Sequence, residues 1–171
     1  MTTLLLLTTL TSPGTDTAVH QERVAKCRAI WQASAPWSYS PELAEFFVTE
    51  HERQCVGDQW WFSLIYGKAN FGLTLHSRSP GLCFGPLDVK WPGFARQVGA
   101  HKPEDLRDPR LNIRAHVAEM AYYHRRTGET GTSLLARVFY PASPRYYHRW
   151  RSVAREHERY LRSWYQKRGT R

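Results

Sequence analysis

Several prolines follow a residue that can cap a helix, and three of these pairs constrain where the helices of this chain begin. The pairs are Ser40-Pro41, Asp108-Pro109 and Ser143-Pro144. A serine or aspartate side chain accepts hydrogen bonds from the unpaired N–H groups of the first helical turn, and the fixed φ of proline suits the first helical position. These helix starts predict that the chain is mainly helical. Its length of 171 residues predicts one domain with a core of ordinary size.

Residues 72–93 interrupt the helical pattern. This segment is rich in glycine, proline and serine, and apolar residues at Leu73, Leu75 and 87–89 are interspersed among them. Glycine and proline favour turns, and short apolar runs between turns favour strands. We therefore expect a loop with a short β-hairpin here, so that the fold class is mainly α with a small β element.

A further helix is predicted to begin after Asp58, which can serve as its N-cap. Trp61, Leu64, Ile65 and Lys68 recur at helical spacing, so one apolar face ends in a positive charge. A lysine at the rim of a core can bury its methylene chain and keep its ammonium group in water. Whether Lys68 has this structural role or a functional one depends on the rest of the chain.

Four blocks of sequence, in the same order, resemble the motifs of the soluble lytic transglycosylase family. LIYGKANF at 64–71 is similar to the family's LIxxESxF, and GPLDVKWP at 85–92 is similar to its GLMQVxP turn. DLRDPRLNI at 105–113 resembles DLxDPxxNI, and FYPASP at 139–144 resembles AYNAGP, with a later tryptophan in register at Trp150. The resemblance implies a lysozyme-like fold, in which the small β element lies beside a cleft that binds the glycan strands of peptidoglycan.

The resemblance also implies that Lys68 occupies the position of the family's acid/base glutamate. That glutamate protonates the glycosidic oxygen and then accepts a proton from the sugar hydroxyl that forms the anhydro product, which requires a group that exchanges protons near neutral pH. An ammonium group has an ordinary pKa of about 10.4, and its charge opposes an oxocarbenium-like transition state. Burial would lower this pKa, but a neutral amine has no proton to donate. Lys68 therefore cannot replace the glutamate.

Other family positions are altered in the same direction. Pro141 stands where the family has an asparagine, so a polar side chain and a backbone donor are both lost. Asp88 stands where the family has a glutamine. The resemblance places Lys68, Phe71, Asp88 and Tyr140 in the glycan-binding groove. We expect this groove to bind peptidoglycan with a degenerate active site.

Two carboxylates are candidates for catalysis in an alternative, in which the chain is an active peptidoglycan lytic transglycosylase or muramidase. Asp88 belongs to the predicted turn beside the cleft, where it could equally pair with Lys68 or cap the turn. Glu119 falls where the family often has a cleft tyrosine, but it is displaced from the apolar stripe of its helix, so we expect it on a solvated face. Glu50 and Glu52 lie on a preceding helix and are expected to be surface charges.

The net charge of +9, with an isoelectric point of about 9.8, favours anionic partners. Cell-wall glycans with carboxylates or phosphates would satisfy this charge, and so would nucleic acid. Apolar residues from Tyr147 to Trp164 follow a helical stripe, with arginines largely on the other faces, which predicts a long C-terminal helix. This helix either packs on the domain with a solvated basic face or makes the chain a basic helical nucleic-acid-binding protein.

Residues 1–20 are expected to be a poorly ordered leader or weak signal segment, ahead of a single domain at 21–171. The apolar run in this leader has no basic residue before it and is too short to span a membrane. The expectation is an exported or cell-envelope protein with no membrane span.

Cys27, Cys55 and Cys83 are odd in number and widely spaced, so one disulfide or three buried thiols are both consistent with the sequence. They do not form a zinc pattern, and His76 and His101 are isolated. A Cys/His catalytic pair would have no recognisable motif around Cys83. No phosphate-binding or dinucleotide-binding loop occurs, so neither a metal nor a cofactor is expected.

Overall fold

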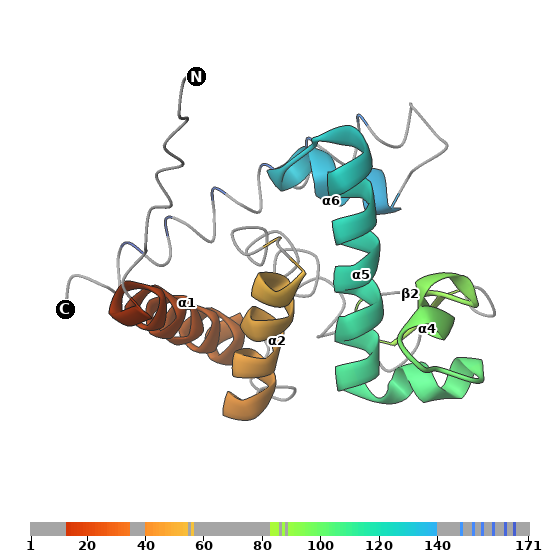
Figure 1. The fold of residues 1–171 in the computed structure, drawn as a ribbon, viewed down its shortest axis with the longest axis horizontal. Helices are drawn as coiled ribbons and strands as arrows, with labels where there is room; N and C mark the ends of the chain where they lie inside the picture. Colours follow the sequence, from red (N-terminus) through yellow and green to blue (C-terminus); the bar gives the residue numbers. More distant parts are fainter. Residues whose placement is uncertain are drawn as a thin grey trace, which may run out of the picture.

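The fold is mainly helical, with a small two-stranded antiparallel sheet, as the sequence predicts (Figure 1). The computed structural model describes residues 13–34, 40–54, 83–85 and 89–139, together with the isolated positions 56, 87, 148, 152, 155, 159, 163 and 166. The side chains of residues 13–16, 33–34 and 139 are not described.

The first two helices form a packed pair. Helix α1 spans Pro13–Ser34 and α2 spans Pro41–Arg53. Ser40 caps α2 as predicted, because its hydroxyl oxygen accepts a hydrogen bond from the backbone N–H of Leu43 at 3.2 Å. Trp31 and Phe47 meet edge to face across the pair, with ring centroids 5.9 Å apart. Their neighbours in the core include Val24, Cys27, Ile30, Ala44 and Val48.

The predicted β-hairpin is present, and its strands are short. Strand β1 (Cys83–Phe84) pairs antiparallel with β2 (Val89–Lys90), so that Phe84 lies opposite Val89. A short helix α4 (Gly93–Gln97) and a 3-10 helix η3 (Pro103–Arg107) follow. Both are short elements that the sequence pattern does not reveal.

Helix α5 (Pro109–Thr127) is the central element. It contacts α2 on one side and β2 and α4 on another, and it also packs against η3 and α6 (Gly131–Phe139) (Figure 1). Asp108 caps α5 as predicted, since its carboxylate accepts from the N–H of Arg110 at 2.7 Å. Gly128 ends the helix in the left-handed conformation that glycine adopts without strain. The third predicted helix start, Ser143-Pro144, lies outside the described residues.

Two expectations about the ends of the chain can be compared with the structure. Residues 13–20, which we assigned to a poorly ordered leader, form the first turns of α1, and His20 Nδ1 lies 2.6 Å from Glu52 Oε2. The boundary predicted at residue 20 therefore falls inside a helix. Beyond α6, six isolated positions are described, and each is helical and exposed: 148, 152, 155, 159, 163 and 166.

A single amide side chain joins the hairpin, η3 and α5. Asn112 is fully buried in the first turn of α5. Its Oδ1 accepts a hydrogen bond from the N–H of Leu87 at 2.9 Å, and its Nδ2 donates to the carbonyl oxygens of Phe84 at 2.8 Å and Leu106 at 3.2 Å. Three main-chain groups from two other segments thereby gain a hydrogen-bond partner, and a buried group left without one would cost about 1–3 kcal/mol.

Gly85 makes this arrangement sterically feasible. Its φ is +73°, in the left-handed region that residues with a side chain rarely adopt. A Cβ atom at this position would overlap the Asn112 side chain and the carbonyl oxygen of Leu106. Position 85 therefore requires glycine for two reasons, its backbone conformation and the close approach of Asn112.

We predict that Gly85→Ala lowers the free energy of unfolding far more than Gly128→Ala does. Gly128 has a similar φ of +68°, but a Cβ there meets nothing within 4 Å. Its substitution should cost only the backbone strain, about 1–2 kcal/mol. Gly85→Ala should cost at least about 2 kcal/mol more, because the turn must move away from Asn112. Urea denaturation of both variants measures the difference, and equal losses would show that the contact with Asn112 is unimportant.

Candidate functional site

Of the residues that sequence analysis proposed for the site, the structure describes one. Lys68, Phe71, Asp88 and Tyr140 lie outside the described residues, so their predicted roles stay predictions. Glu119 is described, on α5.

Glu119 is half-buried and does not lie on the solvated face that we expected. The expectation was wrong because it weighed only the apolar stripe of α5, whereas a second stripe of polar residues also faces inward. Asn112, His116, Glu119 and Tyr123 recur at helical spacing, and the first two are buried. Removal from water raises the pKa of the Glu119 carboxyl to about 7, and the nearby charge of Lys90 offsets only part of this effect.

A carboxyl group with a pKa near 7 can both donate and accept a proton at neutral pH, which is the property that general acid/base catalysis of glycoside cleavage requires. Tyr123 lies close enough for the Glu119 charge to raise its pKa, after burial as the larger cause. Among the described carboxyl groups, Glu119 is the one for which a raised pKa is resolved, and this property suits the chemistry that the resemblance implies.

Two buried histidines lie close enough to interact electrostatically, His51 on α2 and His116 on α5. His51 is fully buried, and its Nδ1 lies 2.7 Å from the carbonyl oxygen of Phe47. Burial lowers the pKa of His51 to about 4, and burial together with the neighbouring His51 lowers the pKa of His116 to about 3. Both rings are neutral at pH 7, so they fill the core as polar, uncharged side chains.

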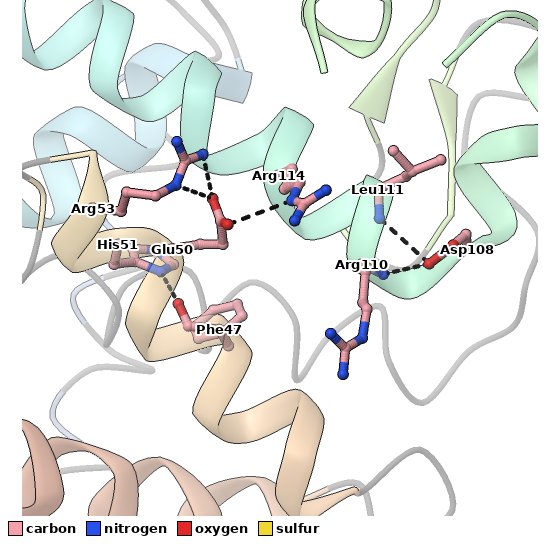
Figure 2. A network of polar contacts seen from close by, with 8 residues as sticks. All are labelled: Phe47, Glu50, His51, Arg53, Asp108, Arg110, Leu111 and Arg114. Carbon is pink, nitrogen blue, oxygen red and sulfur yellow. Dashed lines mark hydrogen bonds and ion pairs between the residues drawn. The ribbon is translucent and has the colours of Figure 1, made fainter. Parts of the chain in front are cut away.

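Glu50 is buried, which corrects our expectation that it is a surface charge. Its side chain is 5% exposed, and its carboxylate accepts hydrogen bonds from two arginines on different helices (Figure 2). Arg53 donates from Nη2 at 2.7 Å and from Nε at 3.2 Å, and Arg114 of α5 donates from Nε at 3.4 Å. A buried carboxylate is tolerated here because both partners are cations. Glu52, the other expected surface charge, is half-buried against His20 and Arg23.

The burial of Glu50 could have been anticipated from spacing. Leu43, Phe46, Glu50 and Arg53 recur every three or four residues, so Glu50 continues a partly apolar face of α2 and has an arginine one turn ahead of it. The partner on α5 was not predictable, because Arg114 lies 64 residues further along the chain.

The Glu50 network forms part of a groove between α2, α4 and α5, with a volume of about 1010 Å³. The α5 side contributes arginine, alanine and tyrosine, and the α4 side contributes Phe94, Gln97 and Val98. Its described lining residues are Glu50, Arg53, Gln54, Phe94, Gln97, Val98, Arg114, Ala118, Tyr122, Tyr123 and Arg125. Glu119 is not one of them. This groove was not foreseen from the sequence.

The described residues hold no group of His, Cys, Asp and Glu side chains that could bind a metal ion. Cys27 is a free thiol at the α1–α2 contact, and burial raises its pKa. Cys83 is half-buried in β1, and Cys55 lies outside the described residues. Within the described ranges, the helices are too short or too polar to cross a bilayer.

Comparisons with protein-family models, with curated proteins and with solved structures give no match for this chain.

We predict that Glu119→Gln stabilises the protein at pH 8 but not at pH 4. Because the folded-state pKa is raised from 4.5 to about 7, the native state favours the protonated acid. That contribution is complete below pH 4.5 and is lost as the pH rises through 7. Glutamine stays neutral, so the variant should gain on the order of 1–3 kcal/mol at pH 8. Urea denaturation at both pH values checks this, with the exposed Glu104→Gln as control. A gain of equal size at pH 4 would contradict the assignment to ionisation.

Proposed function

We propose that this chain is a lysozyme-like domain of the soluble lytic transglycosylase type that binds peptidoglycan glycan strands with a degenerate active site. The observation that carries the proposal is the hydrogen bonding of Asn112. It joins the segment at 105–113 to the turn at 85–92, two of the four blocks on which the resemblance rests.

The residues that the segment at 105–113 shares with the family motif include several with a defined structural role, which supports the resemblance further. The Asp105 carboxylate accepts from the N–H groups of His101 and Lys102, and Asp108 caps α5. Leu106 and Ile113 are fully buried. The polar positions of this motif therefore form hydrogen bonds and its apolar positions pack in the core.

In the resemblance, Lys68 takes the place of the acid/base glutamate, which argues for glycan binding without cleavage. A degenerate groove would still present aromatic rings and polar groups to a sugar strand, with Phe71 and Tyr140 as the expected contacts. Peptidoglycan as the partner implies an exported or cell-envelope location, which also belongs to the proposal.

We expect the purified protein to sediment with insoluble peptidoglycan, and Tyr140→Ala to weaken this binding at fixed salt. Loss of one ring contact should raise the dissociation constant roughly twofold to tenfold. Val19→Ala, which truncates an apolar side chain that is 44% exposed on α1, is the control and should bind as the natural sequence does. Failure to sediment, or complete displacement by DNA with no effect of glycan fragments, would refute the proposal.

The second candidate is an active peptidoglycan-cleaving enzyme in which Glu119 is the acid/base. The observation in its favour is the half-buried carboxyl of Glu119, whose pKa of about 7 suits proton transfer. Asp88, the other candidate, has no comparable support, because it lies outside the described residues.

Under the first proposal, the natural sequence should release no anhydromuropeptides from peptidoglycan above background. Chromatography of the soluble products over several hours measures this release. Turnover that disappears in Glu119→Gln but persists in Glu104→Gln would favour the second candidate. Turnover that disappears only in Asp88→Asn would identify the other carboxylate.

A further inference from the structure

The arginines bound to Glu50 keep much of their surface in water. The Glu50 side chain is 5% exposed, whereas those of Arg53 and Arg114 are 56% and 45% exposed. A guanidinium group has five N–H donors, and the bonds to Glu50 use two nitrogens of Arg53 and one of Arg114. The buried Glu50 carboxylate thus holds both guanidinium groups in place, and their other N–H donors are not used by Glu50.

The groove has a positive charge and aromatic walls. Three arginines and one glutamate line it, which gives a formal net charge of +2. Arg125 has no ion-pair partner within the described part of the chain. Phe94 and Tyr122 lie with ring centroids 5.4 Å apart, and Tyr122 is 38% exposed. Guanidinium groups bind carboxylates and phosphates, and exposed rings pack against the apolar faces of sugars.

We propose that the groove between α2, α4 and α5 binds an anionic glycan, a saccharide strand that carries carboxylate or phosphate groups. Arg53, Arg114 and Arg125 would bind the anionic groups, and Tyr122 with Phe94 would contact the sugar rings. The requirement for an anion rests on the arginines alone, whereas the choice of a glycan rests on the proposed function.

The size and charge of the groove favour a glycan over nucleic acid. Its volume of about 1010 Å³ is at the upper end for pockets that enclose a small ligand, so a segment of a narrow polymer fits it. Binding of nucleic acid without sequence preference depends on many contacts between cationic side chains and phosphates. The groove offers three arginines for such contacts, and the charge of Glu50 opposes them.

The test compares two soluble probes with the full chain at fixed salt. Glycan strands of peptidoglycan from which the peptides have been removed carry a free lactyl carboxylate on each muramic acid, and chitotetraose is neutral. Arg125→Gln and Arg114→Gln should each raise the dissociation constant for the anionic strand about tenfold. Neither change should alter binding of chitotetraose. Arg107→Gln, an exposed arginine on η3, removes the same charge and should leave both constants unchanged.

Four other outcomes of these binding measurements would each contradict a different part of the proposal. If the natural sequence binds the strands but both groove variants bind them equally well, the groove is not the site, and the proposed function still holds. Equal weakening by Arg107→Gln would show general electrostatic attraction in place of a site. If the natural sequence binds neither probe, the glycan assignment and the proposed function both fail. Displacement of the strands by a single-stranded oligonucleotide, with the same arginine dependence, would replace the glycan with nucleic acid.

Discussion

The described fold depends on the Asn112 amide more than on any one apolar contact. Apolar packing holds α1 against α2 and fills the space beneath α5, but such contacts tolerate exchange between residues of similar volume. The Asn112 amide instead has one acceptor and two donors engaged by three backbone groups, which fixes where the hairpin and η3 lie relative to α5. Both α4 and the wall of the groove follow the hairpin, so the orientation of this amide determines their position as well.

Features of the fold that depend on interactions between residues close in the sequence were predictable, and those that depend on distant residues were not. The caps at Ser40 and Asp108 were predictable, because a capping side chain bonds within its own next three residues. The hairpin was predictable from its turn residues. Helix α1 is not among the helices that the sequence analysis predicts, and its first turns lie in the segment assigned to a leader.

The polar interior was the least predictable part. Charged side chains are usually solvated, so neither the burial of Glu50 nor the half-burial of Glu119 follows from residue type alone. Each carboxylate interacts with a cation from a distant part of the chain, Arg114 for Glu50 and Lys90 for Glu119. The two carboxylates then differ in their surroundings. Glu50 has two guanidinium partners within hydrogen-bonding distance, whereas burial raises the pKa of the Glu119 carboxyl and the charge of Lys90 offsets only part of this effect.

The contact between Gly85 and Asn112 has an evolutionary consequence. The two positions are 27 residues apart, yet neither can change alone without a steric overlap or the loss of several hydrogen bonds. Substitutions that leave the fold intact must therefore alter both positions together or neither, which makes this pair slow to diverge. An exposed groove residue such as Tyr122 has no part in this contact, so it can change while the glycine and the asparagine stay together.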